Sequence, residues 1–233
     1  MLRVTITAIR QGTPTVKVFT LATGGERLQF FAGQWVDCYA EIDGELAVAG
    51  YSLTSSPTTR NSVEIAVKRN DDQPVTRFLH ERARVGDQLV LEGGQGDCYF
   101  TAGMAPALVL IAGGIGITPL ISIVRYVCDA ATDTRVTLLH SARSAEEHLY
   151  RAELEQMAAA NPRFRCVFLV SRPGAAQATS HTGRIDRRLL LDIGIDPSAL
   201  YFVCGPGQMI DDVIALLRDL GVPDAQLRFE RWW

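Results

Sequence analysis

The first half of the chain alternates apolar and polar residues with the period of a β-strand. Alternate residues of a strand face opposite sides of a sheet, so this pattern predicts strands with one buried face. Gly and Asp residues separate the runs, as expected for turns. The predicted elements are strands Leu2–Ile9, Thr15–Leu21, Trp35–Ile42, Tyr51–Thr54, Val63–Lys68 and Gln88–Glu92, and a helix Val75–Arg84. Together they predict a small antiparallel β-barrel of the Greek-key type, because closure removes exposed edges.

From Ala105 onward, continuous apolar runs alternate with amphipathic helical patterns. Ser144-Ala145-Glu146-Glu147 matches a capping box and predicts the start of a helix. The predicted order is strand 107–112, helix 119–131, strand 136–140, helix 144–160, strand 166–171, helix 186–191, strand 200–204 and helix 208–220. This order predicts an α/β doubly wound parallel sheet with right-handed crossovers. The expected domains are the barrel at 1–102 and the α/β domain at 103–233.

Composition and charge exclude several classes of protein. A formal net charge of −3 provides no basic surface for nucleic acid or anionic lipid. The five cysteines have no zinc or iron–sulfur spacing, so we expect no metal and a reducing, cytoplasmic setting. Met1 leads into a strand pattern instead of an export signal. Met104–Val124 is uncharged, but Gly113–Pro119 interrupts it, which favours a buried strand, a turn and a helix over a membrane span.

Two glycine-rich turns follow apolar strands in the second half. They are Gly113-Gly114-Ile115-Gly116-Ile117-Thr118-Pro119 and Cys204-Gly205-Pro206-Gly207-Gln208-Met209. Ligands of doubly wound sheets bind beyond the carboxyl ends of the strands. Glycines there let the backbone approach a pyrophosphate, and the next helix presents N–H groups and a positive dipole end. The alternatives are a turn packed only for tightness, and Cys204 as a small buried apolar residue.

Aromatic residues at two places are suited to a flat cofactor. Tyr51 could pack on a ring system while Ser52 donates a hydrogen bond to a ring nitrogen, although such a pair is common in ordinary strands. Trp232 and Trp233 suit either a stacking surface or the closure of a gap between domains.

In their combination and order, these motifs resemble those of the ferredoxin–NADP reductase superfamily. The matching residues are Tyr51-Ser52, Gly86-Asp87-Gln88-Leu89, Gly113–Pro119, Cys204–Met209 and Glu230-Arg231-Trp232. The resemblance covers nearly the whole chain and is strongest to the small branch of oxidoreductase NAD-binding domain-containing proteins. It implies a flavoprotein that transfers a hydride from NAD(P)H to FAD. Electrons would then pass to a separate ferredoxin or flavodoxin, or to a small-molecule acceptor.

The resemblance also implies site residues. Ser52 would face flavin N5, and Cys204 and Glu230 would border the point where nicotinamide C4 meets N5, which makes these three the expected catalytic residues. Thr76 would cap the flavin phosphates at a helix start. The cofactor-binding set is Tyr51, Ser52, Leu53, Thr54, Val67, Lys68, Pro74, Val75, Thr76, Gly113, Gly114, Gly116, Thr118, Pro119, Cys204, Gly205, Pro206, Met209, Trp232 and Trp233.

One position departs from the family pattern. The arginine that neutralises the flavin pyrophosphate falls at Ala49. Losing such a charge-assisted contact costs on the order of 1.5–3 kcal/mol, or about a hundredfold in affinity. We therefore expect weak FAD binding unless Arg69 or Arg77 substitutes.

Basic residues follow the middle strands of the second half. The 2′-phosphate of NADPH needs cationic partners where NADH enzymes tend to place a carboxylate. Arg143, Ser171-Arg172 and Arg184 are candidates, and no acidic residue ends either strand. NADPH is therefore preferred over NADH as the second cofactor, with solvated surface arginines as the alternative.

Two other functions fit the sequence. A reductase that treats free flavin as a substrate would fit the short barrel and Ala49. A non-catalytic dinucleotide-binding protein would bind the nucleotide without turnover. We expect a monomer or weak dimer with no nucleic-acid or membrane partner.

Overall fold

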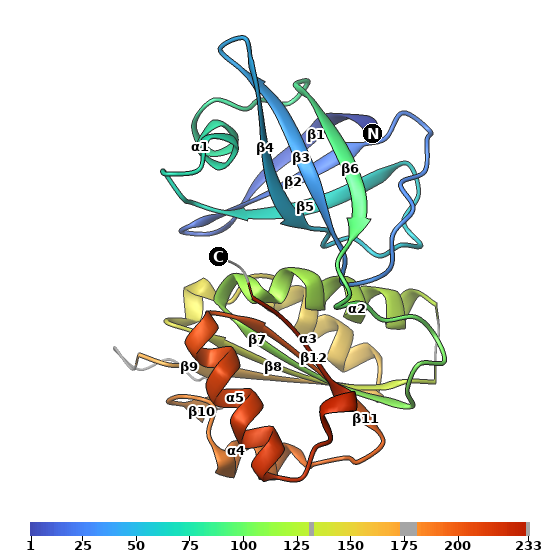
Figure 1. Ribbon diagram of the computed structural model, residues 1–233, viewed down its shortest axis with the longest axis vertical. Helices are drawn as coiled ribbons and strands as arrows, with labels where there is room; N and C mark the ends of the chain where they lie inside the picture. The colour runs from blue at the N-terminus through green and yellow to red at the C-terminus, as the bar shows by residue number, and fades with distance from the viewer. Residues whose placement is uncertain (131–132, 173–180, 232–233) are drawn as a thin grey trace. The chain divides into compact units, whose positions relative to one another are not determined.

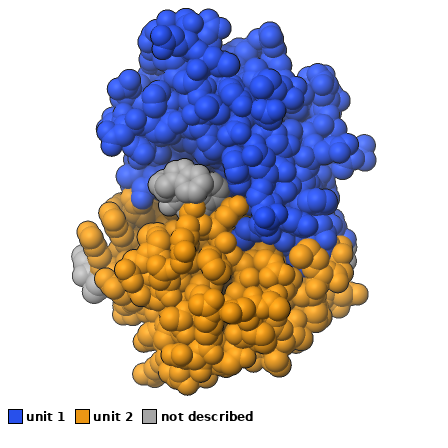
Figure 2. Space-filling view, viewed as in Figure 1, with its two compact units in different colours: residues 1–101, 121–130 blue, residues 102–120, 131–233 orange. Residues whose placement is uncertain are grey.

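The computed structural model describes residues 1–130, 133–172 and 181–231. The chain divides into two compact units, residues 1–101 with 121–130 and residues 102–120 with 131–233 (Figure 2). The first half contains β1 (Leu2–Thr13), β2 (Val16–Ala22), β3 (Trp35–Ile42), β4 (Glu45–Ser52), β5 (Ser62–Lys68), α1 (Pro74–Glu81) and β6 (Gln88–Gln95) (Figure 1). The second contains β7 (Ala107–Gly113), η1 (Gly114–Gly116), α2 (Ile117–Asp129), β8 (Arg135–Ala142), η2 (Ala145–Glu147), α3 (Arg151–Ala160), β9 (Phe164–Val170), β10 (His181–Thr182), α4 (Arg187–Ile193), β11 (Ala199–Gly205), α5 (Gly207–Asp219), η3 (Asp224–Gln226) and β12 (Leu227–Arg231).

The first unit is a six-stranded antiparallel sheet in the order β4-β3-β6-β1-β2-β5. An antiparallel bridge between Leu53 and Ile65 joins the two outer strands, so the sheet closes on itself. Alternate residues of the strands fill its centre, among them Val4, Ile6 and Val36. The predicted antiparallel barrel is confirmed.

Strand β4 begins earlier than the sequence predicted. It starts at Glu45 instead of Tyr51 and pairs with β3 along its whole length. Asp43 and Gly44 form the connecting turn with φ angles of 55° and 85°, the two positive values that a tight hairpin turn requires. Alternation then puts Ala49 on the same strand face as Tyr51.

The second unit is a six-stranded parallel sheet in the order β10-β9-β8-β7-β11-β12. Helices α4 and α5 cover one face and α3 lies on the other (Figure 1). The chain runs outward from β7 through β8 and β9, and then returns to place β11 on the other side of β7. The predicted doubly wound fold is confirmed, and its topological switch point lies between β7 and β11.

The uncharged segment Met104–Val124 forms most of β7, η1 and α2, as predicted. Among the described residues, no helix is both long enough and apolar enough to cross a bilayer.

The predicted helix 144–160 is wrong in its first half. The Ser144 side chain makes no cap, and a single 3₁₀ turn over Ala145–Glu147 is followed by Tyr150 with a φ of 62°. The α-helix begins only at Arg151. His148 breaks the helix because its buried ring bonds to backbone carbonyls of the sheet.

Candidate active site

The two glycine turns contact each other at the switch point of the parallel sheet. Strands β7 and β11 pair directly, with Ala112 opposite Cys204. A Cβ atom at Gly116 would clash with the carbonyl oxygen of Cys204, and one at Gly113 would lie 2.5 Å from Met209 Sδ. Gly116 is therefore required so that the turns can pack together, and a side chain at Gly113 would displace that of Met209. The structure brings these predicted nucleotide-binding residues to one place.

The first turn leads directly into helix α2. Gly114 has a φ of +54°, and the space beside it is open, so the backbone conformation explains this glycine. Thr118 Oγ1 donates to the Ile115 carbonyl at 2.9 Å, and no side chain caps the start of the 3₁₀ turn. The first N–H groups of a helix have no partner within the helix and carry its positive dipole end. This open glycine turn fits a dinucleotide pyrophosphate.

The predicted catalytic residues Cys204 and Glu230 lie side by side. They are register partners on the parallel strands β11 and β12, one residue before β11 ends at Gly205. Cys204 is fully buried and Glu230 is partly buried. A thiol and a carboxyl group therefore occupy adjacent positions next to the glycine turns.

The predicted 2′-phosphate residues gather at the carboxyl ends of neighbouring strands. The Arg172 N–H donates to the Arg143 carbonyl at 3.2 Å, and Ser171 is bonded to the end of β8 through Ala142. Arg184 follows β10, which pairs with β9. All three arginines are exposed, and none forms an ion pair with another described residue.

In the first unit, Tyr51 and Thr76 are joined through their hydroxyl groups, whose oxygens lie 2.7 Å apart. Burial raises the pKa of the Tyr51 phenol above its usual value, so this group stays protonated. Ser52 is 5% exposed at the end of β4. The tyrosine is held in one orientation, which suits packing against a flat ring.

Other predicted flavin residues have less accessible side chains. Leu53, Val67 and Val75 are core residues, so any contact they make with a cofactor must come from their backbone. Lys68 and Pro74 are exposed. Trp232 and Trp233 lie outside the described residues.

Helix α1 has a cap that the sequence did not reveal. Gln73 Oε1 accepts from the Thr76 N–H at 2.8 Å, and Gln73 Nε2 donates to the Val48 carbonyl at 3.0 Å. Glutamine is not among the preferred N-cap residues, so no sequence signal pointed to it. The Thr76 amide is therefore already bonded to Gln73, and its hydroxyl is already bonded to Tyr51, so both polar groups of Thr76 have partners within the first unit.

The surroundings of Ala49 contain few replacements for the family arginine. Arg69 Nε lies 3.0 Å from Asp71, and its Nη2 lies 3.5 Å from Glu81, so this guanidinium is held by carboxylates. Arg77 is exposed on α1. Of the two predicted substitutes, Arg77 is thus the better placed to reach an anion.

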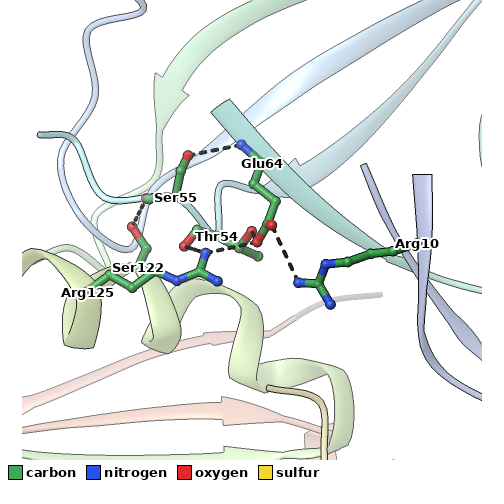
Figure 3. A network of polar contacts seen from close by, with 6 residues as sticks. All are labelled: Arg10, Thr54, Ser55, Glu64, Ser122 and Arg125. Atoms are coloured by element: carbon green, nitrogen blue, oxygen red, sulfur yellow. Dashed lines mark hydrogen bonds and ion pairs between the residues drawn. The ribbon is translucent and has the colours of Figure 1, made fainter. Parts of the chain in front are cut away.

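A polar network fixes the segment that follows the predicted flavin residues (Figure 3). Arg125 Nη1 on α2 lies 2.8 Å from Glu64 Oε1 and donates to the Thr54 carbonyl at 2.8 Å. Ser122 Oγ donates to the Ser55 carbonyl at 2.7 Å, and Ser55 Oγ accepts from the Glu64 N–H at 3.1 Å. Sequence patterns gave no indication of these contacts, because the partners are far apart along the chain.

Comparison with known families assigns both halves of the chain. Residues 4–100 match the oxidoreductase FAD-binding domain, and residues 110–214 match the oxidoreductase NAD-binding domain. The oxidoreductase NAD-binding domain-containing protein 1 of Xenopus laevis is 30% identical over 98% of this chain and 78% of its own length. The chain belongs to the ferredoxin–NADP reductase superfamily. It is an NAD(P)H-dependent flavoprotein oxidoreductase with FAD-binding and NAD-binding domains.

Two further proteins are similar to this chain. The glycine betaine monooxygenase reductase subunit of Chromohalobacter salexigens is 35% identical over 70% of this chain, which covers 44% of that protein. The flavohem-like FAD/NAD-binding domain of nitric oxide dioxygenase from Vibrio cholerae shares the fold, with a TM-score of 0.87 and 24% identity over 99% of this chain and 98% of that one. The sequence-based assignment to this superfamily is confirmed.

Proposed function

We propose that this reductase oxidises NAD(P)H, with NADPH preferred, and passes electrons through FAD to a separate protein such as ferredoxin or flavodoxin, or to a small-molecule acceptor. The observation that carries the proposal is the contact of the two glycine turns beside Cys204 and Glu230 at the switch point. Similarity to a monooxygenase reductase subunit supports a role in supplying electrons to another component.

The proposed roles follow the two units. Residues 1–102 would hold FAD, with Tyr51 along the isoalloxazine and Ser52 toward N5. Residues 103–233 would hold the dinucleotide, with its pyrophosphate on the first glycine turn and its nicotinamide beside Cys204. When bound, FAD accepts a hydride and releases electrons singly. The protein contributes position and electrostatics by holding two flat rings in a reactive orientation.

The visible spectrum of the purified protein tests the proposal. We expect flavin absorbance that is bleached under anaerobic conditions by NADPH and more slowly by NADH. Adding ferredoxin, flavodoxin or a one-electron dye should then restore the absorbance. A flavin-loaded protein that neither nucleotide reduces would contradict the proposal.

The preference for NADPH rests on the exposed arginines at the strand ends. Replacing Arg143, Arg172 or Arg184 by Ala should lower kcat/KM for NADPH about tenfold and leave that for NADH within about twofold, because only NADPH carries the 2′-phosphate. Arg163→Ala is the matched control. Arg163 is also exposed, but it lies just before β9 begins, and its guanidinium pairs with Asp133. Equal losses of kcat/KM with NADPH and NADH would contradict the proposed preference for NADPH.

A second candidate, reduction of free flavin, is favoured by Ala49 and by the ion pairs that hold Arg69. Such a protein would purify without colour and consume NAD(P)H only when FAD or FMN is added, with a rate that saturates in flavin. Retention of stoichiometric FAD through gel filtration would exclude this candidate.

We propose a cytoplasmic location. All five cysteines are free, and this supports a reducing compartment. Measuring the free thiols of protein isolated directly from cells would test this proposal.

A further inference from the structure

A buried histidine contacts the first glycine turn from within the sheet. His140 ends the apolar part of β8, is fully buried, and has its Nε2 3.2 Å from the Gly114 carbonyl oxygen. A carbonyl only accepts hydrogen bonds, so Nε2 must carry the hydrogen. Nδ1 is then a bare acceptor, and it has no hydrogen-bond partner among the described residues. The ring therefore has one polar contact, and that contact is with the turn.

A second histidine holds the first in place. His148 Nε2 lies 3.1 Å from the His140 carbonyl and 3.0 Å from the Leu169 carbonyl, so its N–H links β8 to β9. The two imidazole rings meet edge to face with centroids 5.0 Å apart, and Phe168 packs against His148 at 5.1 Å. Backbone and ring of His140 are both fixed by this cluster.

Packing alone does not account for a histidine at this position. An apolar side chain would fill the same space without leaving a buried nitrogen unsatisfied, which is unfavourable. Burial, and secondarily His148, lower the pKa of His140 to about 3, so the ring is neutral and its single N–H stays on Nε2. What the histidine adds is a directed hydrogen bond to Gly114, the residue at which the chain turns from β7 toward α2.

We propose that His140 is a positioning residue for dinucleotide binding. Its Nε2–H fixes the Gly114 carbonyl and so holds the left-handed turn, which directs the N–H groups that follow toward the phosphates. The inference rests on the proposed role of this turn in binding the dinucleotide. It implies that His140 affects nucleotide affinity and leaves hydride transfer at saturation unchanged.

Four variants separate positioning from packing. His140→Leu and His140→Phe remove the donor, and Phe keeps a ring of similar volume. His140→Gln restores an N–H near the Nε2 position. Phe168→Leu is the matched control, because it disturbs the same cluster and leaves the donor in place.

Calorimetry measures the Kd of NADP⁺, and steady-state kinetics measure kcat and KM. Hydrogen exchange of the intact protein without nucleotide is followed at residues 110–120. For the two donor-free variants we expect Kd and KM to rise about tenfold or more, with kcat within twofold. Exchange at the turn should become faster. His140→Gln and Phe168→Leu should stay within about threefold of wild type in Kd.

Three results would overturn the inference. The Kd could be unchanged in a folded donor-free variant, or Phe168→Leu could raise the Kd as much as the donor-free variants do. Failure of both donor-free variants to fold would show that His140 is a structural residue. Wild-type protein that binds no dinucleotide would instead overturn the proposed function. In that case, exchange at residues 110–120 still reports whether His140 holds the turn.

Discussion

Cys204 and Glu230 are register partners on the parallel strands β11 and β12, so their side chains emerge next to each other on the same face of the sheet. In a parallel ladder this adjacency is fixed by the backbone hydrogen bonds of both strands. The pair lies where β11 runs into the second glycine turn. The geometry thus presents a thiol and a carboxyl group together at the place where nicotinamide is proposed to bind.

Replacing either residue should slow hydride transfer more than it weakens binding. We expect Cys204→Ser and Glu230→Gln to lower kcat about 10–100-fold, with dinucleotide Kd within about threefold, because both residues are proposed to border the reacting atoms and not the phosphates. Stopped-flow flavin reduction measures the step directly. The double variant should lose less than the product of the single losses.

Arg228→Gln is the control for this pair. Arg228 lies two residues before Glu230 on β12 and opposite Phe202, near the amino end of the strand. Its replacement should leave the reduction rate within twofold. A similar loss in all variants would indicate a general disturbance of β12 and contradict a specific role for Cys204 and Glu230.

The glycines of the first turn should differ sharply in their tolerance of alanine. At Gly116 a Cβ would overlap the Cys204 carbonyl, and both backbones would have to move apart. We expect Gly116→Ala to cost about 1–3 kcal/mol of stability and to abolish detectable nucleotide binding. At Gly114 the space is open and only the positive φ opposes a side chain, at a cost of about 1 kcal/mol. Urea unfolding and NADP⁺ titration compare Gly116→Ala with Gly114→Ala. Equal losses of stability and of nucleotide affinity in the two variants would contradict this view of the packing.

The ion pair between Arg125 and Glu64 should contribute strongly to the stability of the first unit. Both side chains are mostly buried, at 15% and 17% exposure, and Arg125 also serves the Thr54 carbonyl. Arg125→Ala leaves Glu64 and that carbonyl without this partner, so we expect a loss of about 2–4 kcal/mol in the free energy of unfolding.

Arg10 provides the matched comparison. It lies 3.5 Å from the other carboxylate oxygen of Glu64 but is 49% exposed (Figure 3). Exposed pairs contribute about 0–1 kcal/mol, so Arg10→Ala should be nearly neutral. If Arg10→Ala and Arg125→Ala lowered the free energy of unfolding equally in denaturant titrations, burial would not be the factor that sets the two contributions.

Restoring the family arginine should tighten FAD binding. Ala49 shares a strand face with Tyr51, and Ala49→Arg would place a guanidinium beside the proposed flavin site. We expect the Kd of FAD to fall about 10–100-fold, as measured by quenching of flavin fluorescence. Ala47→Arg, two residues earlier on the same face, should have no such effect. Equal Kd values for wild type and Ala49→Arg would contradict the proposed placement of the pyrophosphate.

The periodic patterns were sufficient to predict both folds, because strong alternation and continuous apolar runs reflect burial directly. They failed where tertiary contacts override local preference. Glu45–Gly50 has small residues at positions 47, 49 and 50 and no alternation of apolar with polar residues, and pairing with β3 makes it a strand. At Ser144 the capping sequence is locally favourable, but the buried ring of His148 interrupts the helix.

The proximity of the two glycine turns was predictable, because each turn is encoded in consecutive residues at the end of an apolar strand. The contact of His140 with Gly114 was not, since it arises from the parallel register that places His140 opposite Ala112. The available signal was a histidine that directly follows two leucines near the end of the strand. Its meaning depends on which strand pairs with β8, and local sequence does not specify that pairing.

The buried histidines should make the protein acid-sensitive well above the range of its carboxylates. Burial lowers the pKa of His140 from 6.5 to about 3, and burial also lowers the pKa of His148. Below pH 6.5 the unfolded chain therefore binds more protons than the folded one, and stability falls as the pH falls. His140 alone should lower the free energy of unfolding by about 2 kcal/mol between pH 7 and pH 5, because the loss is about 1.36 kcal/mol for each pH unit below about 6.5.

Urea unfolding of wild type and His140→Gln at pH 7, 6 and 5 measures this contribution. Between pH 7 and pH 5, the free energy of unfolding of the variant should fall by about 2 kcal/mol less than that of wild type. The remaining fall should be smaller still in the double variant His140→Gln/His148→Gln. The carboxyl groups whose pKa is lowered, such as Asp43 and Asp196, protonate below this window and should not contribute to it. A wild-type stability that stays flat from pH 7 to pH 5 would show that the His140 ring takes up a proton in the folded state, contrary to the effect expected from its burial.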